Sequence, residues 1–138
     1  MRRRYVTGVL ADTSAWVEYL RATGSLAHRR LRELIDSEAA LATTEVVHLE
    51  LLAGASDADH VTQLRRFLGR FELLPVQGLA DFEAAADLYR RCRLRGETVR
   101  KLEDCLVAAV ALRHGATLLH RDHDFEVIAR HAPLRVMG

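Results

Sequence analysis

Four acidic side chains occupy positions from which a folded domain could gather them into one reactive cluster. Asp12 and Asp122 each follow a short apolar run that is typical of a buried strand. Glu50 lies within an apolar helical segment, and Asp104 lies near the start of another. Because parallel sheets place their ligand sites beyond the carboxyl ends of the strands, we expect the four carboxylates to be neighbours.

The mutual repulsion of these carboxylates decides what the cluster must bind. Each close pair costs roughly 4 kcal/mol at an effective dielectric constant near 20, whereas the total stability of a domain is only about 5–15 kcal/mol. A hard divalent cation relieves this cost, and carboxylates that leave room for several waters suit Mg²⁺ or Mn²⁺. Such a metal lowers the pKa of a bound water and orients a phosphodiester, so the residues predict phosphodiester hydrolysis.

The segment 102–130, which carries Asp104 and Asp122, predicts how the acids are positioned. Helically spaced apolar residues follow Asp104, His114-Gly115 has the form of a helix end, and residues 116–119 have the character of a buried strand. A second helix follows, and a strand flanked by two helices is typical of a parallel sheet in an α/β fold. At 138 residues, the chain is expected to form one domain.

Further elements are predicted along the rest of the chain. Strands are expected at 6–11, 39–42 and 71–76, with an edge strand at 134–137, and helices at 13–20, around 31–35, and at 43–54, 57–70 and 79–94. The helix at 43–54 is apolar nearly all round, so Glu50 needs a specific partner or an aqueous cleft. In the helix at 79–94 we expect Asp81 to be solvated and the inward face to consist of Phe82, Ala85, Ala86 and Tyr89.

Charge and cysteine content narrow the functional classes. Acidic and basic residues nearly balance, with a net charge of +1, so any nucleic-acid contact must be local. A basic run before Asp104 is either a solvated helix end or a rim that contacts phosphates, and it includes Arg95, Arg100 and Lys101, the only lysine of the chain. Cys92 and Cys105 match no metal-binding spacing, which favours reduced thiols in a cytosolic protein.

Targeting and membrane-spanning segments are not expected. The apolar residues after the N-terminal arginines are interrupted at Thr7, Gly8 and Asp12, so no signal-peptide core forms. The longest apolar stretch, residues 105–112, is far too short to cross a membrane.

Four short motifs, in chain order, are similar to those of a known nuclease family. They are DTSA starting at Asp12, ELLAG starting at Glu50, EDCLVAA around Asp104 and HRDHDF around Asp122. Together they resemble a PIN-domain ribonuclease, specifically a VapC-type toxin of a bacterial toxin–antitoxin pair. The likeness extends over residues 9–128, and four ordered motifs are much more specific than any one of them.

The resemblance implies a structure, a site and partners. The fold would be a single PIN-like domain, residues 1–138, in which a mainly parallel sheet of about five strands lies between layers of helices. The metal-binding catalytic quartet would be Asp12, Glu50, Asp104 and Asp122, assisted by Thr13 or Ser14. RNA would be the substrate, and the partners would be a second copy of the chain and a small VapB-type antitoxin whose tail blocks the site.

The fourth motif leaves two candidates for the inner metal ligand. Where many relatives have threonine two residues before the fourth acid, this chain has His120. We favour Asp122 over Asp124, because Asp124 beside Phe125 fits a helix-capping position.

Other site chemistries fit the sequence less well. A receiver domain needs a lysine after a late strand, and a PD-(D/E)xK nuclease fails for the same reason, because Lys101 is the only lysine of this chain; no glycine-rich phosphate loop is present either. A zinc site made by His120, Asp122, His123 and Asp124 would require consecutive residues on one turn to converge on an ion. The remaining rival is a PIN-like module that binds RNA or protein without cleaving, but such a module is expected to have lost at least one of the four acids.

The sequence therefore predicts a cytoplasmic, metal-dependent endoribonuclease, which is a hydrolase. Asp12, Asp104 and Asp122 are expected to hold Mg²⁺ or Mn²⁺, and Glu50 to complete the coordination shell or to orient the attacking water. Arg95, Arg100 and Lys101 are expected to contact RNA phosphates.

Overall fold

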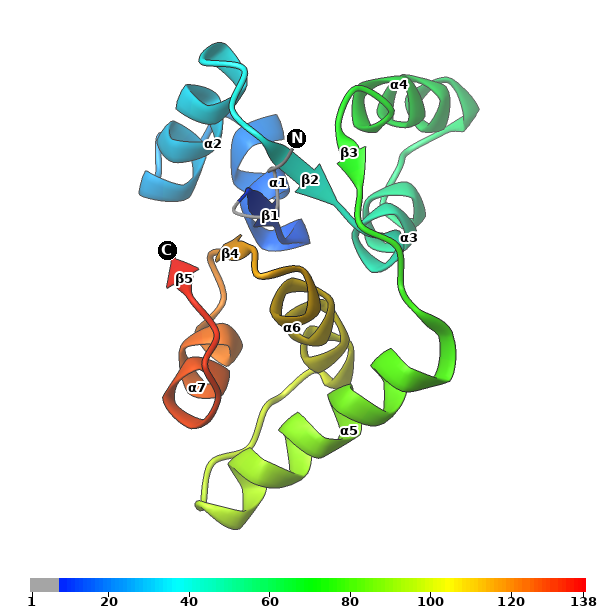
Figure 1. Ribbon diagram of the computed structural model, residues 1–138. Helices are drawn as coiled ribbons and strands as arrows, with labels where there is room; N and C mark the ends of the chain where they lie inside the picture. Colours follow the sequence, from blue (N-terminus) through cyan, green and yellow to red (C-terminus); the bar gives the residue numbers. More distant parts are fainter. Residues whose placement is uncertain (1–7) are drawn as a thin grey trace, which may run out of the picture.

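A parallel sheet lies at the centre of the computed structural model, which describes residues 8–138 (Figure 1). Within these residues the strands are β1 (Val9–Ala11), β2 (Leu41–Thr43), β3 (Glu72–Leu73), β4 (Thr117–Leu119) and β5 (Val136–Met137). Their order is β3-β2-β1-β4-β5, and every neighbouring pair is parallel. The predicted α/β class and parallel sheet are confirmed, and β1 and β4, the strands that precede Asp12 and Asp122, are neighbours.

Helices cover both faces of this sheet. They are α1 (Thr13–Leu20), α2 (Leu26–Asp36), α3 (Glu45–Ala53), α4 (Ala58–Leu68), α5 (Gly78–Leu94), α6 (Leu102–His114) and α7 (His123–His131). Figure 1 shows α1, α2 and α4 on one side of the sheet and α5, α6 and α7 on the other. Along each strand successive side chains alternate between faces, so Leu10 and Leu118 enter one core while Ala11 and Leu119 enter the other.

The α6 helix is the most deeply buried element on the α5–α7 side. Its residues from Asp104 to Ala111 are all buried, and their small side chains let α5 and the sheet approach closely. The helix ends at Gly115, whose φ of 64° is left-handed and whose N–H donates to the carbonyls of Ala111 and Leu112. The chain then enters β4 at Thr117, one residue after the predicted start of this strand.

Several strand boundaries differ from the prediction. Residues 6 and 7 of the first predicted strand lie outside the described residues, and β2 begins two residues later and ends one residue later than expected. β3 is much shorter than residues 71–76, because the chain leaves the ladder where Pro75 cannot donate. Its last contact with β2 is the bond from Leu74 N–H to the carbonyl of Thr43, at 2.8 Å.

The inward face of α5 was predicted correctly only in part: Ala85 is buried and Tyr89 is half-buried against the core, as expected. Phe82 is 55% exposed and Ala86 is also exposed, whereas the buried residues of this helix are Asp81, Ala85, Leu88 and Cys92. Asp81 is therefore not solvated but 3% exposed, and Arg113 of α6 donates to both of its oxygens. The buried residues of α5 follow helical spacing from Asp81 to Cys92, so an acid, rather than the Phe82 ring, faces α6.

The helix that carries Glu50 is also less buried than its composition indicated. Leu49 of α3 is 69% exposed, while Val46, Val47 and Leu51 are buried. The helix thus has an open side, and Glu50 lies at partial exposure.

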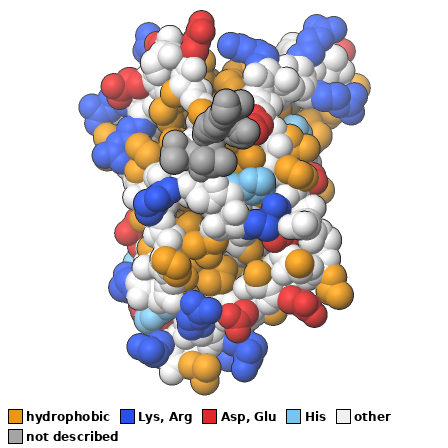
Figure 2. Space-filling model, in the orientation of Figure 1, with side chains coloured by type: hydrophobic (Ala, Val, Ile, Leu, Met, Phe, Trp, Pro, Cys, Tyr) orange, Lys and Arg blue, Asp and Glu red, His pale blue; other side chains and the backbone are white. Residues whose placement is uncertain are grey.

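Surface charge is mixed, as the near-zero net charge led us to expect. On the face seen in Figure 2, basic and acidic side chains are interspersed around apolar areas. Across residues 8–138, the structure has no helix whose length and apolar character would let it traverse a bilayer.

The two cysteines give a test of the core on the α6 side. Cys92 and Cys105 are free and buried, and burial raises the pKa of the Cys105 thiol to about 12. We therefore expect neither thiol of the native protein to react appreciably with a thiol reagent such as DTNB, whereas both react in urea. Fast labelling of either cysteine in the native protein would contradict this packing.

The Asp81–Arg113 pair predicts a stability difference between two acids of the same helix. Arg113 is partly exposed, so we expect Asp81→Ala to lower the free energy of unfolding by about 2 kcal/mol, somewhat below the cost of breaking a fully buried pair. Asp87→Ala removes an exposed pair with Arg91 and should cost less than about 0.5 kcal/mol. Urea unfolding of both variants measures the difference, and equal losses would refute the structural role of Asp81.

Candidate metal centre

Asp12 follows β1 directly and begins α1. It is the N-cap of that helix: its Oδ2 accepts hydrogen bonds from Ser14 N–H at 2.9 Å and from Ser14 Oγ at 2.7 Å. Its other oxygen, Oδ1, is buried without a hydrogen-bond partner among the described residues. Burial raises the pKa of Asp12, although the two bonds from Ser14 oppose that rise. Oδ1 is therefore an uncompensated acceptor that a cation would satisfy.

Asp104 lies in the first turn of α6 and is 1% exposed. Its pKa is raised to about 9, first by burial, then by the negative charge of Asp12 and by a hydrogen bond with Asp124. Without a metal, Asp104 thus holds a proton at neutral pH. Its Oδ2 is the second buried carboxylate oxygen at the site that lacks a hydrogen-bond partner in the described part of the chain.

The fourth motif places Asp122 and Asp124 at the start of α7, and it corrects one assignment. Asp122, not Asp124, is the N-cap, because its Oδ1 accepts from Asp124 N–H at 3.0 Å. Asp124 is instead buried in the first turn, where its carboxylate accepts the backbone N–H groups of Arg100 at 3.1 Å and Lys101 at 3.0 Å. The prediction of Asp124 as the cap was wrong, because both residues of an Asp-x-Asp pair suit a helix start.

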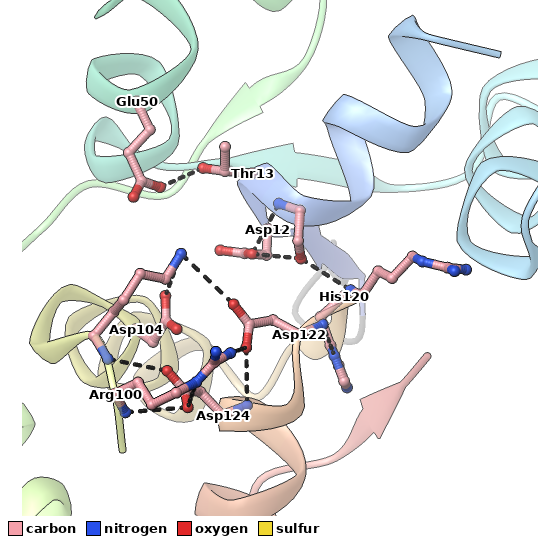
Figure 3. Close-up of polar contacts among 11 residues, drawn as sticks. Asp12, Thr13, Glu50, Arg100, Asp104, His120, Asp122 and Asp124 are labelled. Atoms are coloured by element: carbon pink, nitrogen blue, oxygen red, sulfur yellow. Dashed lines mark hydrogen bonds and ion pairs between the residues drawn. The ribbon is translucent and has the colours of Figure 1, made fainter. Parts of the chain in front are cut away.

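Three of these acids converge on one point. Asp104, Asp122 and Asp124 each offer an oxygen, and the three oxygens lie within 4.8 Å of one another. Asp12 is not part of this tight group, although its carboxylate is close enough to affect the pKa of Asp104 (Figure 3). The two unpartnered oxygens and the all-oxygen donor set fit a hard divalent cation such as Mg²⁺ or Mn²⁺.

Glu50 reaches the site from α3, on the other side of Asp12 in Figure 3. Thr13 Oγ1 donates to Glu50 Oε1 at 2.5 Å, which supplies the partner that the sequence led us to expect. Ser14 Oγ, which donates to Asp12, also accepts from Arg121 N–H at 2.9 Å. Thr13 and Ser14 therefore fix Glu50 and Asp12 respectively, and Ser14 also ties α1 to the chain after β4.

Two basic side chains, those of Arg100 and Lys101, form ion pairs with the acids of the cluster. Arg100 approaches Asp122 Oδ1 at 3.1 Å and Asp124 Oδ1 at 3.4 Å. The Lys101 ammonium lies 3.6 Å from Asp122 Oδ2 and 4.0 Å from Asp104 Oδ1. Burial alone would lower the pKa of Lys101, but the charges of Asp104 and Asp122 outweigh it and raise the pKa. Arg95, at the end of α5, forms no ion pair with these acids within residues 8–138.

His120 is a site residue whose role was not predicted from the sequence. It is buried, its Nδ1 accepts Asp122 N–H at 3.0 Å, and its Nε2 lies 2.9 Å from Glu126 Oε2. The ring thus holds the backbone from which the Asp122 carboxylate projects. Both ring nitrogens are engaged, which argues against the zinc site considered from the sequence. In the sequence, the spacing His-x-Asp after a strand could have indicated that His120 accepts a hydrogen bond from the backbone N–H of Asp122.

The proton on Asp104 predicts a pH dependence of stability. Between pH 3.8 and about 9 the folded metal-free protein keeps this proton, whereas the unfolded chain releases it. The contribution of Asp104 to the free energy of unfolding therefore falls as pH rises through this window. Asp104→Asn should flatten the dependence measured by urea unfolding in EDTA between about pH 5 and pH 8. The same slope in both proteins would show that Asp104 is already ionised.

Comparison with known sequences gives the chain a family. The PIN-domain family matches residues 9–131, a range that contains all the acids described above. Ribonuclease VapC11 of Mycobacterium tuberculosis is 52% identical over 123 residues, which are 88% of this chain and 92% of that protein. Ribonuclease VapC51 of the same species is 30% identical over 120 residues, which are 87% of this chain and 84% of that protein.

Solved structures show the same fold. DNA-bound VapBC from Salmonella typhimurium has a chain that aligns with a TM-score of 0.73 and 17% identity, over 95% of this chain and 97% of that chain. VapBC-1 from nontypeable Haemophilus influenzae aligns with a TM-score of 0.74 and 15% identity, over 94% and 96% of the two chains. The sequence match, the fold and the arrangement of acids agree, and the chain belongs to the PIN-domain family.

Proposed function

We propose that this protein is a metal-dependent endoribonuclease and the toxin of a toxin–antitoxin pair. The observation that carries the proposal is the gathering of buried acids at the ends of β1 and β4, where oxygens of Asp12 and Asp104 find no partner within residues 8–138. RNA as the substrate is supported by the ribonuclease names of relatives that are 52% and 30% identical. An antitoxin partner is supported by structural neighbours that are VapBC complexes.

The side chains divide the work of hydrolysis among them. Asp12, Asp104 and Asp122 would hold Mg²⁺ or Mn²⁺, with Asp124 as the alternative ligand. When bound, the metal supplies a water of lowered pKa and polarises the phosphoryl oxygen. Asp104 must release its proton to serve as a ligand, because metal-binding carboxylates are ionised.

Glu50 is suited to a different role from the three aspartates. Thr13 occupies its Oε1, so Oε2 is the oxygen that can accept a hydrogen bond from the attacking water and fix its approach to the phosphorus. Arg100, Lys101 and the more distant Arg95 would contact phosphates and place the RNA without reading its sequence.

The resemblance also supports a homodimer and a cytoplasmic location. Leu79 and Phe82 are exposed one turn apart on α5 and offer an apolar surface for a second copy. The two buried, unpaired cysteines accord with a reducing compartment.

Cleavage of a mixed structured RNA by the purified protein tests the proposal. With Mg²⁺ or Mn²⁺ the wild type should cut, and EDTA should abolish cutting. Asp12→Asn should lower the rate by more than the ~10–100-fold that loss of an outer-shell partner causes, because it removes a ligand itself. The matched control is Asp57→Asn, which changes the N-cap of α4 away from the site and should leave cleavage unchanged.

The cleavage assay also distinguishes a nuclease from a PIN-like module that binds RNA or protein without cleaving. RNA that is bound but never cut, with any divalent metal, would contradict the nuclease and indicate a binding module. Cutting that persists in Asp12→Asn would place the chemistry elsewhere.

A further inference from the structure

The loop between α5 and α6, residues 95–101, is tied to α7 at two places. Near its start, Glu97 accepts from Arg130 Nε at 3.1 Å and lies 2.6 Å from His131 Nε2. At its end, Asp124 accepts the backbone N–H groups of Arg100 and Lys101. We call this segment the α5–α6 loop, and its two ties fix where its last side chains can lie.

Asp124 differs from Asp12 and Asp104 in how its oxygens are used. Oδ1 accepts from Arg100 N–H and approaches Arg100 Nε, and Oδ2 accepts from Lys101 N–H. Asp12 and Asp104, by contrast, each keep a buried oxygen without a partner in the described chain. A metal would therefore compete with backbone donors at Asp124 but not at Asp12 or Asp104.

These bonds also begin α6. Lys101 is the N-cap of that helix, but its side chain cannot accept a capping bond. Asp124, from a different helix, accepts the N–H of Lys101 itself and so holds the residue at which α6 begins, and Asp104 N–H bonds to the Lys101 carbonyl at 3.0 Å. The carboxylate thereby fixes the backbone from which the Lys101 side chain extends.

The Lys101 ammonium lies where a phosphate would meet the acids. It is within 4.0 Å of Asp104 and Asp122, and it also feels the charges of Glu50 and Asp12. The side chain is 47% exposed, so a ligand can reach it from solvent. An ammonium is a compact charge that can serve carboxylates and a phosphate together without the planar geometry of a guanidinium.

We propose that Asp124 is a positioning residue that holds the α5–α6 loop so that Lys101, as a catalytic residue, contacts the phosphate at the bond to be cut. This role rests on the proposed function and assigns Asp124 away from the metal. Lys101 then supplies a fixed positive charge at the reacting phosphate, which the protein carries whether or not metal is bound.

Metal-free RNA binding tests the proposal through the sign of the effect. The probe is a fluorescein-labelled structured RNA, such as a transfer RNA, and its affinity is measured by anisotropy in EDTA at several salt concentrations. Removing a negative charge from the site should by itself strengthen binding of a polyanion. Glu50→Gln, the matched control, is expected to do so. Asp124→Asn is expected to do the reverse and weaken binding by about 5-fold, because Lys101 loses its position.

Lys101→Met shows whether Asp124 acts through the lysine. It should weaken binding and reduce the slope of log affinity against log salt by about one, as expected for one lost phosphate contact. In the Lys101→Met background, Asp124→Asn should no longer weaken binding. Glu97→Gln weakens the contacts of the α5–α6 loop with Arg130 and His131 and leaves the clustered carboxylates unchanged. It should therefore weaken RNA binding, as Asp124→Asn does.

The contrary outcomes are distinct from failure of the nuclease. Stronger RNA binding by Asp124→Asn, or equal weakening with and without Lys101, would overturn the positioning role. An unchanged salt slope in Lys101→Met, or no metal-free binding by the wild type, would overturn the phosphate contact. Cleavage in Mg²⁺ is measured in parallel, and it reports on the proposed function independently of these results.

Discussion

Repulsion between buried carboxylates is the constraint on which the rest of this structure depends. The sheet brings the ends of β1 and β4 together, so Asp12 and Asp122 must lie near each other. Three helices start at this place: α1 at Asp12, α7 at Asp122, and α6 with Asp104 in its first turn. Each helix start carries partial positive charge and free N–H groups, which partly compensate the acids before any cation arrives.

The chain compensates the negative charge of these carboxylates only in part, and this leaves the site able to bind a cation. Ser14 satisfies one oxygen of Asp12, the other oxygen has no partner in the described part of the chain, and burial raises the pKa of Asp104 to about 9. A fully satisfied cluster would be more stable, but it would have no affinity left for a metal. The carboxylates of the cluster thus lack full compensation of their charge. Asp81, by contrast, is compensated completely, because Arg113 donates to both of its oxygens.

The fold, and the approach of the four candidate acids to one another, could be predicted because both depend on local patterns. Apolar runs that end in an acid, and a helix that ends at Gly115, specify where strands stop in a parallel sheet. The roles of Asp81, Asp124 and His120 could not be predicted, because each depends on a partner distant in sequence or on the side chain's direction. Arg113 is 32 residues from Asp81, and the backbone donors of Asp124 lie more than 20 residues before it. Phe82 was expected to face inward because it is aromatic, but the buried face of α5 begins one residue earlier, at Asp81, and a charged residue is rarely assigned to a core from sequence.

The left-handed turn at Gly115 connects α6 to β4 almost without a loop. α6 has 13 residues, so it acts as a lever about 20 Å long, with the turn at one end and Asp104 at the other. A residue that resists positive φ at position 115 would tilt this lever, and a tilt of only about 5° would move the far end by nearly 2 Å. Displacements of this size disrupt catalytic geometry. A substitution at Gly115 would therefore move Asp104 relative to the other carboxylates.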